Sequence, residues 1–154
     1  LSRLTSTVLA YEPNPKLYAF LERAAAPGVQ CRQVALSDAA GEAELLIPGE
    51  NGRYSNQGAS LNPDKVGDAP HMRVTVEAAR LDDLDPPATG FLKIDVEGHE
   101  RAVLDGAKGL ITRDRPIMII EIEERHTGRD LNEELDYVEA LGYRTLALAD
   151  GKLM

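Results

Sequence analysis

The sequence predicts an α/β fold, in which helices pack around a mostly parallel sheet. Short apolar runs alternate with stretches whose apolar residues recur at helical spacing, and this alternation is typical of strand–helix–strand units. Of the 154 residues, 43% are hydrophobic and 28% charged, a balance typical of a folded globular protein. The length and the lack of internal repeats or low-complexity linkers predict one domain over residues 1–154.

A strand and a helix are expected at the start. The apolar run 7–11 predicts a buried strand that ends at Glu12. Asn14 suits a helix N-cap, and Pro15 suits the first helical position because its φ is already helical. Apolar residues then recur at helical spacing before the helix stops near Gly28, namely Leu17, Phe20, Leu21 and Ala24.

The middle of the chain is less regular. Residues 29–36 predict a second strand, Gly41 a turn, and residues 45–47 a strand that pairs backwards. Residues 48–70 are rich in Gly, Asn, Pro and Ser. Because a loop of this length inside a compact domain is usually functional, we expect it to be an insertion that contributes to a substrate site. A further strand is expected at 72–76.

The second half predicts strands at 91–96, 116–122 and 143–148. A helix over 98–111 separates the first two, with an inward stripe of Val103, Leu104, Ala107, Leu110 and Ile111. A second helix begins at Asp130, where Glu133 completes a capping-box pattern. Asp150-Gly151 then predicts a hairpin turn into a strand that starts at Lys152.

Composition argues against several kinds of partner. Acidic residues outnumber basic ones by 26 to 17, and the net charge of −9 argues against nucleic-acid and anionic-membrane binding. No apolar run approaches the roughly 20 residues of a membrane span, and the first residues lack the basic-then-apolar pattern of a signal segment. Cys31 is the single cysteine, so an internal disulfide is excluded and a reducing, cytoplasmic setting is favoured.

Acidic residues gather where the expected parallel strands end, the edge at which ligands bind in such sheets. Glu12 ends the first strand, where a carboxylate either accepts hydrogen bonds from a ribose or favours the adjacent helix N-terminus electrostatically. Asp95, Glu97 and His99 flank Gly98 after the strand 91–96, and a histidine there can take a proton near neutral pH. We interpret Glu100 as an acid that decorates a helix N-terminus.

Glu121 stands out because it lies inside the apolar run 116–122, where a carboxylate is costly without a partner. His126 in the following loop suits the surface as well as a site. The three histidines lack metal-ligand spacing, so no zinc site is expected. The absence of Gly-x-Ser-x-Gly and Gly-x-x-x-x-Gly-Lys from the sequence excludes serine hydrolases and P-loop nucleotidases.

Six segments, in this order, resemble the FkbM-type methyltransferases: AYEPNP at 10–15, ALSD at 35–38, NQGASL at 56–61, LDDL at 81–84, LKIDVEGHE at 92–100 and IIEIEERH at 119–126. The resemblance implies a Rossmann-like methyltransferase sandwich. It also implies S-adenosylmethionine-dependent methyl transfer to a hydroxyl of a small molecule, such as a sugar or polyketide. Such enzymes carry a first strand with a Gly-rich loop before EPNP and a final strand at the end. The resemblance therefore implies that residues 1–154 are an incomplete domain that lacks both.

The same resemblance implies a role for each motif residue. Glu12 binds the cofactor ribose, with Asn14 in the same motif, while Ser37 and Asp38 lie beside the adenine. Asp95, a cofactor contact, and Glu97 face the methyl group, and Glu121 lines the acceptor side. His99 is the first candidate for the base that deprotonates the acceptor, with Asp95, Glu97 and Glu121 behind it. No resident metal is expected, although Asp95 and Glu121 leave a divalent cation as an open alternative.

Two other functions stay open. One is a truncated, non-catalytic Rossmann-like domain used for binding or assembly. The other is a nicotinamide-dependent oxidoreductase, because Glu12 would hold the ribose of any adenosine cofactor. The expected partner is a small-molecule acceptor, and assembly with further copies of the chain also stays open.

Overall fold

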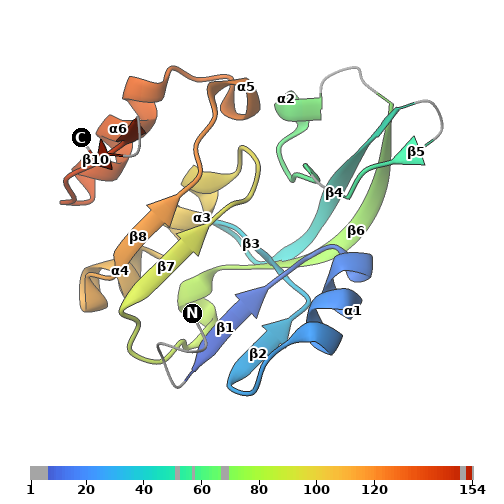
Figure 1. Cartoon of the computed structure of the whole chain (residues 1–154), viewed down its shortest axis with the longest axis horizontal. Coiled ribbons are helices and arrows are strands. Elements are labelled where there is room, and N and C mark those ends of the chain that lie inside the picture. Colours follow the sequence, from blue (N-terminus) through green and yellow to red (C-terminus); the bar gives the residue numbers. More distant parts are fainter. Residues whose placement is uncertain (1–6, 51–52, 57, 67–69, 150–151, 154) are drawn as a thin grey trace.

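Two pairs of parallel strands form the centre of the computed structural model (Figure 1), which describes residues 7–50, 53–56, 58–66, 70–149 and 152–153. Strand β1 (Val8–Tyr11) pairs with β2 (Val29–Arg32), and β7 (Phe91–Ile94) pairs with β8 (Ile117–Ile120). All four strands point the same way in Figure 1. Their carboxyl ends therefore share one edge, as the sequence predicts.

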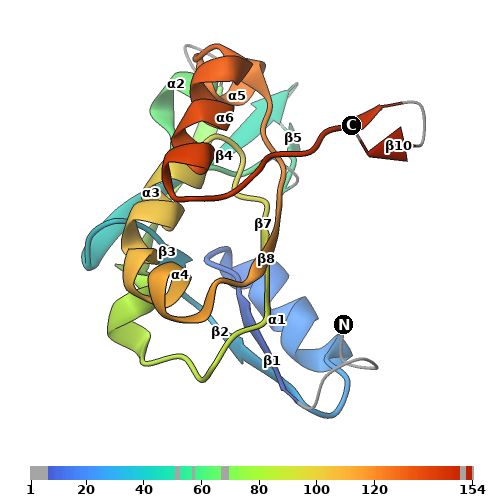
Figure 2. The ribbon, with the colours of Figure 1, turned by 90° about the vertical axis from the view of Figure 1, so that its left-hand side faces the viewer.

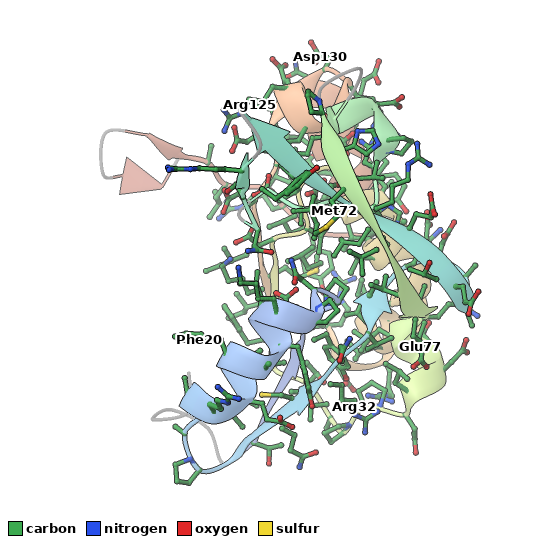
Figure 3. All side chains as sticks on the ribbon, turned by 90° about the vertical axis from the view of Figure 1, so that its right-hand side faces the viewer. Phe20, Arg32, Met72, Glu77, Arg125 and Asp130 are labelled. Atoms are coloured by element: carbon green, nitrogen blue, oxygen red, sulfur yellow. The ribbon has the colours of Figure 1, made fainter. Side chains whose placement is uncertain are left out.

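Helix α1 (Pro15–Ala24) follows β1 and begins as predicted. The Asn14 side chain caps it, since Oδ1 accepts hydrogen bonds from the backbone N–H groups of Lys16 (3.0 Å) and Leu17 (3.4 Å). None of the four apolar positions of this helix is fully buried: Leu17 and Leu21 are half-buried, Ala24 is exposed, and Phe20 is 72% exposed on the outer side of the helix (Figure 3). The reason is that α1 packs against β2 on a sheet of only two strands, too narrow to cover all four positions.

The predicted strand 29–36 is two strands that belong to different sheets. After β2 the chain continues into β3 (Ala35–Leu36), which lies in a four-stranded sheet of order β3-β6-β4-β5. Strand β4 (Gly41–Glu50) pairs antiparallel with β6 (His71–Ala79), and β5 (Arg53–Tyr54) borders β4. The strand at 45–47 therefore pairs backwards on a later strand and not on the preceding one.

The predicted helix over 98–111 is broken into α3 (Glu100–Gly106) and α4 (Lys108–Asp114). The break falls at Ala107, whose φ of −114° is not helical. The predicted inward stripe is nevertheless buried at all five positions. Gly106 allows α3 to approach the chain after β3, because a Cβ there would run into the backbone carbonyl of Ser37.

Strand β8 is shorter and more exposed than predicted. Ile117 is 71% exposed and Ile119 is also exposed, because α3 and α4 cover only the opposite face of the β7–β8 pair. After β8 come α5 (Glu124–Thr127) and α6 (Leu131–Ala140), which Asp130 caps by accepting from the N–H of Asn132 at 2.8 Å.

Among the residues that the structure describes, the last two strands pair only with each other. Strand β9 (Leu148–Ala149) pairs antiparallel with β10 (Lys152–Leu153), and this hairpin projects from the body (Figure 2). The predicted strand 143–148 is therefore irregular over most of its length, and the predicted turn residues 150 and 151 lie outside the described part of the chain. None of the described helices has the length and apolar character needed to cross a membrane.

Two short elements connect these parts. Helix α2 (Pro63–Val66) interrupts the loop between β5 and β6, and the 3-10 helix η1 (Leu81–Leu84) forms the predicted connection before β7. Figure 1 shows α2 beside α5, near the carboxyl ends of β7 and β8, and the two helices are in contact. The predicted loop at 48–70 therefore contains the end of β4, strand β5 and helix α2, and its α2 part lies near the edge where the parallel strands end.

Candidate functional site

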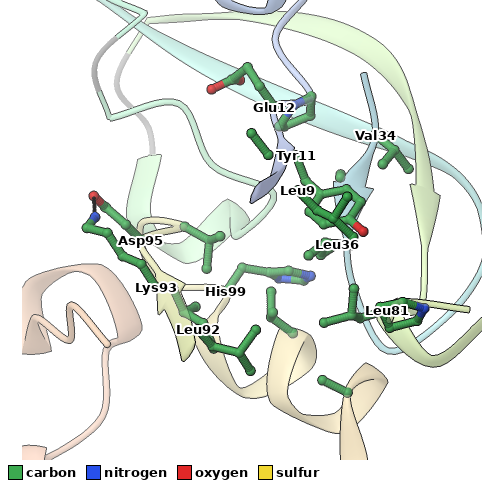
Figure 4. A pocket seen from close by; sticks show the side chains of 18 of the residues that line it. Leu9, Tyr11, Glu12, Val34, Leu36, Leu81, Leu92, Lys93, Asp95 and His99 are labelled. Carbon is green, nitrogen blue, oxygen red and sulfur yellow. Dashed lines mark hydrogen bonds and ion pairs between the residues drawn. The ribbon is translucent and has the colours of Figure 1, made fainter. Parts of the chain in front are cut away.

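A cavity of about 1060 Å³ lies between β1 and β7 (Figure 4). Residues 7–13 form one wall and residues 86–97 the other, and apolar side chains from β3, η1, α3 and α4 close the space between them. Within the described chain, β1 pairs only with β2 and β7 only with β8. Two strand edges with unused backbone hydrogen-bonding groups therefore face the same cavity.

Glu12 lies on the cavity wall at the carboxyl end of β1, as the sequence predicts. Its Oε1 accepts a hydrogen bond from the Asn14 N–H at 2.8 Å, whereas Oε2 takes no hydrogen bond from any residue that the structure describes. Burial raises the pKa of Glu12, and the hydrogen bond from Asn14 partly offsets this effect. The site therefore offers a half-buried carboxylate oxygen that is free to accept from a ligand.

Tyr11 is a polar residue that lines the cavity. The sequence predicted it only as part of an apolar strand. Its hydroxyl is buried and has no hydrogen-bond partner among the described residues, and burial raises its pKa. A buried hydroxyl without a partner is costly, so a bound molecule with a polar group here would be stabilised.

His99 joins the turn after β7 to the segment after β3. Its Nε2 lies 2.9 Å from the Ser37 hydroxyl oxygen, and Ser37 also donates to Asp38 at 3.1 Å. Burial lowers the pKa of His99, while the nearby Asp38 carboxylate acts in the opposite direction. The structure thus brings three predicted site residues together, although only His99 of the three lines the cavity.

Asp95 and Glu97 both line the cavity after β7. Asp95 is exposed and forms an ion pair with Lys93. Glu97 has a φ of +59°, a left-handed conformation that is unfavourable for a residue with a side chain. Gly98 follows with a φ of +97°, and the turn is therefore tightly constrained at two consecutive positions.

Four predicted site residues do not line the cavity, namely Asn14, Ser37, Asp38 and Glu121. Glu121 is the one of these that was predicted to be catalytic. The strand ends at Ile120, so the Glu121 side chain is solvated and the expected cost of a carboxylate in an apolar run does not arise. Its N–H donates to the carbonyl of Ile94 at 2.9 Å, next to Asp95. Among the residues described, no group of three or more His, Cys, Asp or Glu side chains is placed to hold a metal ion.

Glu100 lies in the first turn of α3, as its interpretation as a helix N-terminal acid expects, and it is buried. Its Oε1 accepts from the N–H of Gly98 at 2.8 Å, and its Oε2 is buried without a partner in the described structure. Burial raises its pKa. The carboxyl group of Glu100 thus supports the turn that carries Glu97. This role exists because the turn folds back over the start of α3.

The segment 56–65 connects the two sides of the site. Asn56 accepts a hydrogen bond from the buried amide of Asn14 at 3.0 Å, and the Ser60 hydroxyl donates to the Glu97 carbonyl at 2.7 Å. The amide of Asn62 donates to the carbonyls of Gly98 (3.2 Å) and His126 (2.8 Å). The NQGASL segment pointed to this region, but nothing in its spacing indicated which partners it would contact.

The fold and site define an α/β protein with a ligand-sized cavity at the carboxyl ends of its parallel strands, the position where such sheets bind nucleotide cofactors. Residues 3–145 match the family described as the methyltransferase FkbM domain, and the chain belongs to this family. This confirms the family predicted from the sequence motifs.

A solved structure shows the same fold. The crystal structure of methyltransferase FkbM from Methylobacillus flagellatus KT is similar with a TM-score of 0.54 at 17% sequence identity. The likeness covers 88% of this chain and 30% of that chain, so the present chain spans less than a third of that protein's length. No curated protein matches the chain.

Proposed function

We propose that the protein transfers a methyl group from S-adenosylmethionine to a hydroxyl of a small molecule. The observation that carries this proposal is the free Glu12 oxygen on the wall of a cavity at the strand ends. A carboxylate in this position can accept hydrogen bonds from the vicinal hydroxyls of a ribose. Family membership supports the reaction class.

The residues present fit such a cofactor. The partnerless hydroxyl of Tyr11 offers a further polar contact, and the apolar side chains around Leu36 and Leu81 suit an adenine ring beside Ser37 and Asp38. When bound, the cofactor supplies an activated methyl group on a sulfonium. The chain's own task is then to align the acceptor, exclude water and remove the acceptor proton.

Among the predicted catalytic residues, we assign proton removal to Glu97. Asp95, Glu97 and His99 line the cavity, but His99 is engaged with Ser37 at the end proposed for the adenine. Asp95 is exposed to solvent whereas Glu97 is half-buried, and Glu121 lies outside the cavity. We therefore propose that His99 supports the cofactor end, with Asp95 as a cofactor contact.

The same cavity supports a proposal about the sheet. Within the described residues, the facing edges of β1 and β7 each leave backbone N–H and C=O groups unpaired, and a parallel strand between them would satisfy both sets. We propose that the complete domain inserts such a strand, with its Gly-rich loop, from a segment outside residues 1–154, and adds a final strand after β10. The free, half-buried thiol of Cys31 fits the proposed cytoplasmic setting.

Ligand titration of the full-length protein tests the function. We expect calorimetry to detect binding of S-adenosylmethionine and S-adenosylhomocysteine and no binding of NADH. Preferential binding of NADH would support the oxidoreductase alternative instead, and binding of none of the three would favour a non-catalytic domain.

The pH dependence of that binding gives a second test. A protonated Glu12 loses an acceptor for the ribose, and because burial raises its pKa, affinity for S-adenosylhomocysteine should start to fall at mildly acidic pH. The contribution of Glu12 to the stability of the unliganded protein has the opposite pH dependence. Because the folded state binds this proton more readily than the unfolded chain, the free energy of unfolding rises as the pH falls through the Glu12 pKa. Titrations that extend from neutral pH down to the ordinary pKa of a glutamate, about 4.3, should show the fall in affinity in the wild type. A flat wild-type profile would contradict the assignment.

A further inference from the structure

Two basic side chains bind one oxygen of the Glu97 carboxylate. Its Oε2 forms an ion pair with Lys65 Nζ and lies 3.1 Å from His126 Nδ1. Lys65 is held in turn, because its ammonium donates to the carbonyl of Gly58 at 2.8 Å and its side chain is only 10% exposed. A buried lysine with two acceptors has little freedom, so it fixes the position of the carboxylate that it binds.

The second oxygen of Glu97 has a different environment. Oε1 accepts no hydrogen bond from any described residue, and Glu97 lines the cavity. One oxygen of the carboxylate is therefore tied to the protein and the other is available to a molecule in the cavity. The same segment also fixes the backbone, since Ser60 holds the Glu97 carbonyl and Asn62 holds the Gly98 carbonyl.

The strained backbone of Glu97 needs this support. A left-handed φ costs free energy at a residue with a side chain, and such conformations persist only where the surroundings hold them, most often at functional sites. Here the supporting groups come from residues 58–65, more than 30 positions earlier, and from His126 on α5. They converge on one carboxylate that faces the cavity.

We propose that Lys65 and His126 are positioning residues that aim the free Oε1 of Glu97 at the reacting methyl group and the acceptor hydroxyl. This inference rests on the proposed function and names the residues that orient its base. In the step, the acceptor oxygen bonds to the methyl carbon and the methyl–sulfur bond breaks. The hydroxyl proton passes to Glu97 Oε1 and leaves to solvent.

Sinefungin provides a probe of this geometry that needs no knowledge of the acceptor. It carries a primary amine where the donor carries its methyl group, whereas S-adenosylhomocysteine has nothing there. We expect the full-length wild type to bind sinefungin more tightly than S-adenosylhomocysteine, because the ammonium can donate to Glu97 Oε1. Glu97→Gln should reduce this preference on the order of 10-fold, the loss typical of one charged hydrogen bond.

Lys65→Met separates positioning from simple charge. If Lys65 only neutralises Glu97, its removal should strengthen the attraction of the cationic probe; if it aims the carboxylate, the preference should fall, as in Glu97→Gln. Lys108→Met is the matched control, because Lys108 pairs with Asp105 and does not line the cavity. The preference of Lys108→Met for sinefungin over S-adenosylhomocysteine should equal that of the wild type.

The outcomes are distinct. A preference that is unchanged or increased in Lys65→Met, with S-adenosylhomocysteine still bound, would overturn the positioning role. If Lys65→Met does not fold, His126→Gln decides by the same criterion. If the wild type binds neither sinefungin nor S-adenosylhomocysteine, the proposed function on which the inference rests would be refuted instead.

Discussion

Alanine at Gly98 is expected to destabilise the protein strongly. Gly98 has a φ of +97°, and a Cβ there would collide with the backbone carbonyl of His126 and lie 2.8 Å from its carbonyl carbon. The left-handed conformation costs about 1–2 kcal/mol, and forcing atoms into a packed site costs about 1–3 kcal/mol more. Urea unfolding of Gly98→Ala should therefore show a loss of roughly 2–5 kcal/mol.

The matched control is Gly128→Ala. Gly128 also has a positive φ, +67°, but no atom lies within 4 Å of the Cβ that alanine would add. This variant should lose only the conformational part, about 1–2 kcal/mol. Equal losses of unfolding free energy in the two variants would mean that the turn after β7 does not pack closely against the His126 carbonyl on α5. Binding of S-adenosylhomocysteine should weaken only in Gly98→Ala, because only that change displaces Glu97.

Glutamine at Glu12 is expected to weaken binding of S-adenosylhomocysteine by about 10- to 100-fold, the loss typical of hydrogen bonds to a charged group. The substitution keeps an oxygen that can accept from the Asn14 N–H, so the helix start should survive. The free oxygen that faces the ligand is replaced by an amide, which donates and cannot accept from a ribose hydroxyl. Calorimetric titration of both proteins measures the difference.

Glu42→Gln provides the control for charge. Glu42 is an exposed acid on β4 and does not line the cavity, so its substitution changes the net charge equally. Its affinity for S-adenosylhomocysteine should match the wild type. If the affinity of Glu12→Gln also matched that of the wild type, Glu12 would serve only the helix start and the ribose assignment would be wrong.

The features that the sequence predicted correctly depend on local chemistry. Asn14 caps α1 because the cap, the following proline and the apolar spacing all lie within a few residues. The inward stripe of α3 and α4 is buried because helical periodicity survives the break at Ala107. Glu12 lies at a strand end because the apolar run before it is a strand.

The features that were missed depend on partners far away in the chain. The run 29–36 divides between two sheets because β3 pairs with β6, more than 40 residues later. Lys65 is 32 positions from Glu97, and no spacing rule connects a lysine in a polar loop to that carboxylate. The helix N-terminal position of Glu100 was predicted, but its burial and its hydrogen bond from the Gly98 N–H follow from the turn folding over it.

The central claim is that the cavity between β1 and β7 binds S-adenosylmethionine, with the ribose on Glu12 and the methyl group facing Glu97. A crystal structure of the full-length protein with S-adenosylhomocysteine tests this most directly. The account predicts ribose hydroxyls within hydrogen-bond distance of Glu12 Oε2, the adenine beside Ser37, and the sulfur directed towards Glu97. A ligand bound outside this cavity, or in it with the ribose away from Glu12, would contradict the account.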